Sequence, residues 1–211
     1  MGNKRVHANA TVLPDGRVIV IGGTRNGNTD DNSFDESQKV LESELWSPTT
    51  ETFTPAAVMK TARGYHSSAL LLPDGRVLSA GGGGCGSCPE SHADAEIYYP
   101  PYLFKTDGSG KLVERPVISQ FPASITYNTG FEVSSTDAAI TSSAVLMRLG
   151  AATHAFDQGQ MRVPLSINRR LGGTLSLTAP NNANIAPPGM YMLFIIDATG
   201  VPSVAKILRL Q

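Results

Sequence analysis

The sequence lacks a dominant charge and a long hydrophobic run, and it contains only two cysteines. Its 17 lysines and arginines nearly balance 18 aspartates and glutamates. That balance argues against a nucleic acid or an anionic membrane as partner, since either would leave a basic patch on the protein. No run of about 18 apolar residues is present, so no membrane-spanning helix is predicted. The first residues, MGNKRVHANA, lack the apolar segment of a signal peptide.

The two cysteines, Cys85 and Cys88, are too few for a zinc site made of cysteine alone, which needs four. A thioredoxin-like C-x-x-C stands at the start of a helix, whereas this pair follows four glycines and precedes no helical pattern. A local disulfide or two free thiols remain. We favour the disulfide, which implies an oxidising compartment and therefore an extracellular or secreted protein.

The sequence does contain an internal repeat. Residues 6–23, VHANATVLPDGRVIVIGG, resemble residues 65–82, YHSSALLLPDGRVLSAGG. In each copy an Asp-Gly turn separates two β-rich runs, a Gly-Gly pair ends the unit, and a further strand candidate follows at residues 40–48 or 94–101. Strand, tight turn, strand and a later strand are typical of a propeller blade, and kelch is the nearest named type.

Two blades cannot close a propeller, which needs about four to eight. We therefore expect a partial kelch-type propeller over residues 1–101, whose missing N-terminal blades belong to a longer protein. From residue 102 to 211 the repeat stops, and short strand candidates at regular spacing predict an immunoglobulin-like β-sandwich. They lie at residues 130–135, 143–150, 161–167, 173–180, 189–197 and 205–210. The predicted fold class is all-β.

Tyr65 and His66 are adjacent, and adjacent side chains of a regular strand point to opposite faces. They can share one metal ion only at a strand end or a bulge, which Gly64 permits. Seven residues separate Arg5 from the first LPDG, but eight separate Arg63 from the second, and one extra residue is what a bulge requires. Taken alone, such a pair is more often blade packing than a metal site.

Four further segments stand out along the chain. They are RGYHSSALLLPDGRV (63–77), GGGGCGSCPESHADAEIYYPPYL (81–103), LMRLGAATHAFDQGQMRVPL (146–165) and PGMYMLFIIDATGVPSVAKILRL (188–210). In this order they resemble the galactose oxidase and glyoxal oxidase family of copper radical oxidases. The resemblance covers nearly the whole chain, and it implies a kelch propeller followed by an immunoglobulin-like domain. It also implies one copper ion and the oxidation of a primary alcohol or aldehyde, with O2 reduced to H2O2.

The resemblance assigns roles residue by residue. It implies that Tyr65 is an axial copper ligand and proton acceptor, that His66 and His154 are the imidazole ligands, and that His92 lies in the second shell. It also implies that Cys85 and Cys88 form a disulfide. The family's radical cofactor, a tyrosine bonded to a cysteine, has no counterpart in this chain. The chain is therefore expected to hold part of an active site and to be inactive in isolation.

Two further residues are assigned to the substrate. His7 occupies the place of His66 in the first repeat, and Phe34 lies in the polar insertion between the repeats. The substrate class is a small alcohol, aldehyde or carbohydrate, with galactose, glyoxal and simple primary alcohols all open. The alternative function is a non-catalytic kelch and immunoglobulin-like module that binds glycans or proteins.

Overall fold

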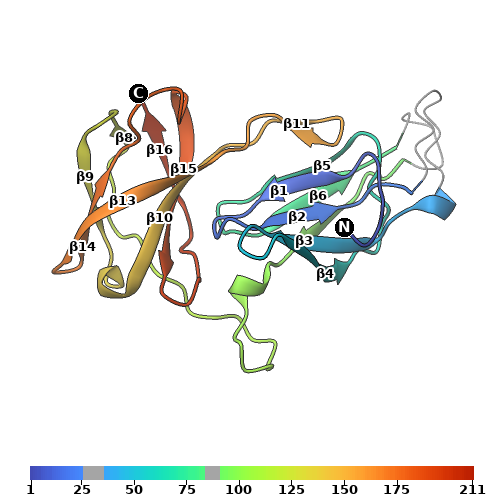
Figure 1. Ribbon diagram of the computed structural model, residues 1–211, viewed down its shortest axis with the longest axis horizontal. Coiled ribbons are helices and arrows are strands. Elements are labelled where there is room, and N and C mark those ends of the chain that lie inside the picture. Colours follow the sequence, from blue (N-terminus) through green and yellow to red (C-terminus); the bar gives the residue numbers. More distant parts are fainter. Residues whose placement is uncertain (26–35, 84–90) are drawn as a thin grey trace. The chain divides into compact units, whose positions relative to one another are not determined.

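The computed structural model describes residues 1–25, 36–83 and 91–211 (Figure 1). Its regular elements are almost all strands, and the only helices among the described residues are three short 3-10 turns. These are η1 (Glu36–Gln38), η2 (Pro101–Leu103) and η3 (Ala138–Ile140). The prediction of an all-β fold is therefore confirmed. None of the helices in the described residues has the length and apolar character needed to cross a membrane.

The chain forms two compact units that do not follow chain order strictly. The first comprises Met1–Leu72, Arg76–Tyr98 and Gly150–Gln160, and the second comprises Pro73–Gly75, Tyr99–Leu149 and Met161–Gln211. The sequence placed one boundary after residue 101. The structure instead assigns residues 150–160, which include His154, to the first unit, although both flanking segments belong to the second.

The first repeat folds as a four-stranded antiparallel sheet whose strands follow one another in chain order. Its first two strands are joined through Gly16, which has φ 91°, a conformation that glycine adopts without strain. Leu13 N–H donates to Arg17 O at 2.8 Å and closes this turn. The strands are β1 (Asn9–Val12), β2 (Val18–Ile21), β3 (Glu42–Ser47) and β4 (Thr52–Val58).

The second repeat forms a sheet of the same antiparallel order, with three strands among the described residues. Leu72 N–H donates to Arg76 O at 2.8 Å, so the second LPDGR segment makes the same turn as the first. The two sheets have the strand order predicted for two propeller blades. The strands are β5 (Ser67–Leu71), β6 (Val77–Gly81) and β7 (Ala95–Tyr98).

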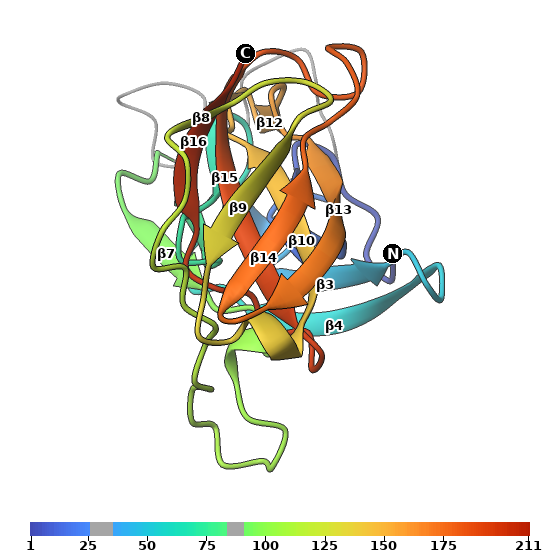
Figure 2. The same cartoon turned by 90° about the vertical axis from the view of Figure 1, so that its left-hand side faces the viewer.

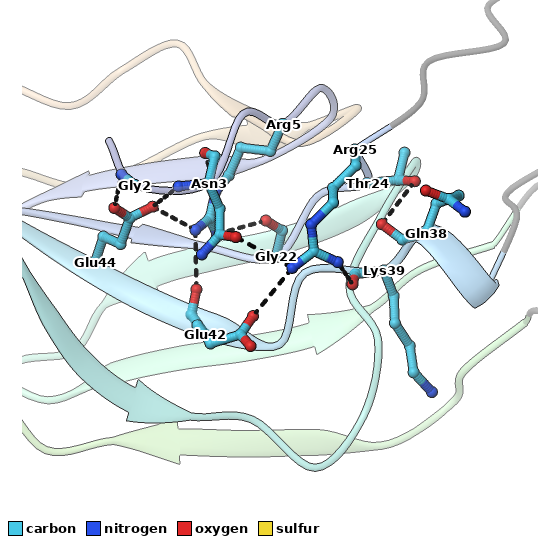
Figure 3. Close-up of polar contacts among 10 residues, drawn as sticks. All are labelled: Gly2, Asn3, Arg5, Gly22, Thr24, Arg25, Gln38, Lys39, Glu42 and Glu44. Carbon is cyan, nitrogen blue, oxygen red and sulfur yellow. Dashed lines mark hydrogen bonds and ion pairs between the residues drawn. The ribbon is translucent and has the colours of Figure 1, made fainter.

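A buried arginine fastens the chain just before the first strand of each sheet. In the first sheet this residue is Arg5, whose side chain is 1% exposed (Figure 3). Its guanidinium donates to Gly22 O at 2.9 Å and to the Glu44 carboxylate at 2.6 Å. Because removing one partner of a buried ion pair leaves an uncompensated charge, such pairs are costly to break, at about 3–5 kcal/mol.

Arg63 repeats this arrangement in the second sheet. Its side chain is fully buried and donates to Gly81 O at 2.9 Å and to Asp94 Oδ1 at 3.0 Å. Its other terminal nitrogen lies 3.6 Å from Glu96 Oε1. Since Arg63 immediately precedes Gly64 and Tyr65, this anchor fixes the backbone that enters the candidate site.

The second unit is built on seven strands in the order β8-β16-β15-β10-β13-β14-β9. The long strand β13 pairs with β10 over its first half and with β14 over its second, with an irregularity between Ile167 and Arg169. The sheet thereby becomes two layers around one core, as Figure 2 shows. The strands are β8 (Ser124–Ile125), β9 (Gly130–Ser134), β10 (Thr141–Arg148), β13 (Arg162–Leu171), β14 (Thr174–Thr178), β15 (Gly189–Asp197) and β16 (Lys206–Leu210).

The core of this sandwich joins residues from strands at opposite ends of the sheet order. Val133 and Leu177 come from β9 and β14, while Leu193 and Leu208 come from β15 and β16, and none of the four is exposed. Such packing is what defines a β-sandwich. The predicted immunoglobulin-like architecture of this part of the chain is confirmed.

Candidate functional site

Tyr65 and His66 lie in a turn immediately before β5. Ser67 N–H donates to Gly64 O at 3.0 Å and closes the turn, and His66, its third residue, has φ 62°. A positive φ at that position is the geometry of a type II turn, where glycine or asparagine is usual. Because the pair precedes the strand, the alternation of strand side chains does not separate it, and the two ring centroids lie 3.9 Å apart.

His154 lies at the tip of a short hairpin. The strands β11 (Ala152–Thr153) and β12 (Phe156–Asp157) pair antiparallel, with Thr153 opposite Phe156. His154 and Ala155 form the connection and have φ 52° and 60°. Two positive φ values in a two-residue loop are the signature of a type I′ turn, which strongly prefers Asn-Gly.

The two segments bring three rings together within the first unit. The ring centroids of His66 and His154 are 4.8 Å apart, and those of Tyr65 and His154 are 5.8 Å apart. His7 joins the group through an edge-to-face contact with Tyr65 at 5.3 Å. We call His7, Tyr65, His66 and His154 the Tyr-His cluster.

The Nδ1 atoms of both central histidines are already engaged. His66 Nδ1 lies 3.1 Å from Gly83 O, and His154 Nδ1 lies 2.7 Å from Thr153 Oγ1. A carbonyl oxygen can only accept, so His66 carries its proton on Nδ1, and the same tautomer lets His154 donate to the threonine hydroxyl. In that tautomer Nε2 of each ring keeps its lone pair, which is how metal-binding histidines are usually prepared.

Backbone strain concentrates at the same place. His7 also has a positive φ, 56°, so three residues of the cluster adopt the left-handed conformation. A residue other than glycine costs roughly 1–3 kcal/mol there and persists only where the surrounding structure enforces it. Strain of this kind is concentrated at functional sites.

The other predicted site residues are not part of the Tyr-His cluster as the structure describes it. His92 is half-buried, and its N–H donates to Gly82 O at 3.0 Å. Phe34, Cys85 and Cys88 lie outside the described residues. Across residues 1–25, 36–83 and 91–211, no group of three or more His, Cys, Asp and Glu side chains is arranged to hold a metal ion. Besides the imidazoles, the Tyr65 phenol is the candidate metal donor within the Tyr-His cluster.

Sequence reasoning missed the residue that ties the two segments together. Ser67 accepts from Ala155 N–H at 3.1 Å through its carbonyl, and its hydroxyl accepts from Asn9 Nδ2 at 2.8 Å. It thus links the residue after His66 to the residue after His154. The only signal in the sequence was its position directly after the Tyr-His pair.

Two family models match the chain. The model described as Glyoxal oxidase N-terminus matches residues 1–98, and the model described as Galactose oxidase-like, Early set domain matches residues 115–210. Together they cover most of the sequence. With the all-β fold, they make the chain similar to glyoxal oxidases and galactose oxidases over most of its length.

Individual relatives agree with the family. A galactose oxidase of Gibberella zeae is 39% identical over 97% of this chain and 29% of its own length. The aldehyde oxidase GLOX of Vitis pseudoreticulata is 32% identical over 98% of this chain and 41% of its own. Among solved structures, a fungal alcohol oxidase of the AA5 family in complex with copper matches with a TM-score of 0.92 and 34% identity.

The chain is shorter than each of these relatives. It spans 29% of the galactose oxidase and 41% of GLOX, and its whole length matches 43% of the fungal alcohol oxidase chain. The relatives therefore contain large parts that this sequence does not.

Proposed function

We propose that this chain supplies part of the copper site of an oxidase that converts a primary alcohol or aldehyde with O2 and releases H2O2. The observation that carries the proposal is the convergence of the Tyr65, His66 and His154 rings, with Nδ1 of each histidine already engaged. The copper complex of the fungal alcohol oxidase supports the choice of metal.

The donor set fits copper. Cu(II) favours nitrogen and oxygen ligands in a tetragonal arrangement, and this cluster offers two imidazole nitrogens and one phenol oxygen. Bound copper would supply a one-electron redox centre and would polarise an oxygen ligand. His66 and His154 would hold the metal through Nε2, while Gly83 O and Thr153 Oγ1 fix the two ring orientations.

Tyr65 has the chemistry of a proton acceptor. A phenol titrates at about 10 in water, so a phenolate held beside a substrate hydroxyl can take its proton. His7 packs against the Tyr65 ring. We assign contact with the substrate to His7 and, from the sequence alone, to Phe34. His92 would support the metal ligands without binding the metal itself. A Cys85–Cys88 disulfide would accompany an extracellular location.

The overall reaction removes two protons and two electrons from RCH2OH, giving RCHO, and O2 takes up both protons and both electrons to become H2O2. A single copper ion accepts only one electron, so a second redox group is needed. We assign that group to a cysteine-linked tyrosine in the remainder of the parent protein, since the two cysteines of this chain belong to the glycine-rich loop.

Copper titration of the 211-residue chain tests the ligand assignment. We expect one Cu(II) per chain, and we expect His154→Ala or His66→Ala to abolish that binding. His7→Ala is the matched control, because His7 shares the left-handed backbone and touches Tyr65 but is not assigned as a ligand. Undiminished binding by His154→Ala would refute the proposed site.

A further inference from the structure

The hairpin that carries His154 is fastened to the first sheet by one side-chain amide. Gln160 Oε1 accepts from Val12 N–H at 2.8 Å, and Gln160 Nε2 donates to Ala10 O at 2.7 Å. Val12 and Ala10 lie on β1, which among the strands of the described residues pairs with β2 alone and forms an edge of its sheet. The Gln160 amide therefore bonds to β1 as a neighbouring strand would, with one donor and one acceptor.

A second connection joins the same hairpin to the neighbouring sheet. Ala155, the residue after His154, donates its N–H to Ser67 O at 3.1 Å. Ser67 in turn accepts from Asn9 at the start of β1, and both of these side chains are buried. Hydrogen bonds thus connect Gln160 to β1, β1 to Ser67, and Ser67 to Ala155 in the same hairpin segment as Gln160.

The segment between the two connections is internally braced. Asp157 is 8% exposed, and its Oδ1 accepts from Ala151 N–H at 2.8 Å and from Gly159 N–H at 3.1 Å. An added Cβ at Gly150 would lie 2.4 Å from the same carboxylate, so the base of the hairpin is closely packed. A displacement at Gln160 is therefore passed along the segment to its tip.

We infer that Gln160 is a positioning residue, which holds the His154 imidazole against His66 and Tyr65 without touching the cluster itself. The inference rests on the proposed function, because its purpose is the spacing of the two copper ligands. Its physical content, the docking of the hairpin on β1, exists whether or not a metal is bound.

The test replaces the amide with a side chain of similar length that cannot form hydrogen bonds. In Gln160→Met, amide hydrogen exchange of the 211-residue chain should accelerate about tenfold at Val12 and at Ala155, since two hydrogen bonds to β1 are lost. Gln158→Met is the matched control, because Gln158 lies in the same segment with an exposed side chain. It should leave both amides unchanged. The Val20 amide in β2 reports whether the sheet itself is intact.

Copper binding provides a second measurement, which would not change if Gln160 had a purely structural role. Gln160→Met should bind Cu(II) about tenfold more weakly and should alter the Cu(II) electron paramagnetic resonance spectrum, whereas Gln158→Met should do neither. Gln160→Glu keeps the acceptor for Val12 and loses the donor to Ala10, so its exchange rates should fall between those of wild type and Gln160→Met.

The outcomes separate the two ideas. Wild type that binds no copper, with Ala155 exchange still accelerated in Gln160→Met, would contradict the proposed function and leave the positioning of His154 supported. Unchanged Ala155 exchange in Gln160→Met would overturn the positioning role. Accelerated exchange with unchanged copper affinity and spectrum would also overturn it, since the contact would then stabilise the segment without setting the ligand geometry.

Discussion

At the scale of single residues, Tyr65 is the group whose proposed chemistry is easiest to isolate. Tyr65→Phe keeps the ring contacts with His66 and His154 and removes only the hydroxyl. A positioned proton acceptor contributes about 10²–10⁴-fold to a rate. We expect the parent oxidase carrying Tyr65→Phe to lose activity by a factor in that range.

Peroxide release with a primary alcohol, measured under copper saturation, checks this prediction. Tyr99→Phe is the matched control, because Tyr99 belongs to the second unit and is not a member of the Tyr-His cluster. Full activity of Tyr65→Phe would remove the tyrosine from the mechanism.

Glu44 links the stability of the first unit to pH. Burial by itself would raise the pKa of Glu44, but hydrogen bonds from Gly2 N–H and the Arg5 side chain, with the Arg5 charge, hold it below 4.5. A carboxylate with a lowered folded pKa stabilises the fold above its unfolded pKa and loses that contribution as the pH falls through the folded pKa. The free energy of unfolding of the first unit should therefore decrease below about pH 4.5.

Trp46 makes this measurable, because it is the only tryptophan and lies on β3. Urea unfolding followed by its fluorescence should show the decrease between pH 5 and 3 in wild type and a smaller decrease in Glu44→Gln. Glu42→Gln, with a side chain about half exposed, should behave as wild type. An unchanged pH dependence in Glu44→Gln would assign acid sensitivity to other carboxylates.

At the scale of elements, the turn from β3 to β4 contains a strained residue that is not part of the Tyr-His cluster. Glu51 is exposed, has φ 54° and donates its N–H to Ser47 O at 2.9 Å. Left-handed backbone costs a residue with a Cβ about 1–2 kcal/mol. Glycine avoids this cost, but the greater conformational entropy of glycine in the unfolded chain offsets part of the gain. Glu51→Gly should raise the free energy of unfolding of the first unit by about 0.5–1 kcal/mol.

The same urea titration through Trp46 provides the measurement. Thr49→Gly is the control, because Thr49 lies in the same turn without a positive φ. It should lower the free energy of unfolding by about 0.5–1 kcal/mol. Equal effects of the two substitutions would show that the backbone at Glu51 relaxes without strain.

Regular strands and Asp-Gly turns were predictable because their signals are local. The alternation of β-rich runs around LPDG predicted β1, β2, β5 and β6. The bulge predicted from the extra residue before the second LPDG was wrong, because β5 pairs with β6 without a register shift and His66 lies in the turn before β5. Strand β4 was missed because Pro55 interrupts it, and a proline within a run argues against a strand. It is tolerated there because β4 is an edge strand.

The hairpin at His154 was not predictable from local pattern. Its strands have two residues each, and its turn is His-Ala where Asn-Gly would be the usual signal. The contact of Gln160 with Val12 spans 148 positions, so it depends on the folded arrangement of β1. The resemblance to copper radical oxidases located His154, but the means of holding it emerged only from the structure.

At the scale of the whole molecule, three proposed ligands without a second redox group should not sustain catalysis. The 211-residue chain, supplied with Cu(II), O2 and galactose, glyoxal or glycerol, should bind copper weakly and release no peroxide above that of free copper. Reductant must be left out, because free copper with a reductant makes peroxide unaided. Sustained turnover that His154→Ala abolishes would show that the chain contains another electron acceptor.

The membership of residues 150–160 in the first unit has a consequence for dissecting the protein. A fragment ending near residue 101 would contain both repeat sheets and would still lack His154, Ala155 and Gln160. It would lose one proposed imidazole and expose the edge of β1 that Gln160 covers. A chimera that grafts a foreign C-terminal region onto these repeats would therefore take the proposed ligand at the His154 position from the donor. The hairpin of the donor would also have to match β1 and Ser67.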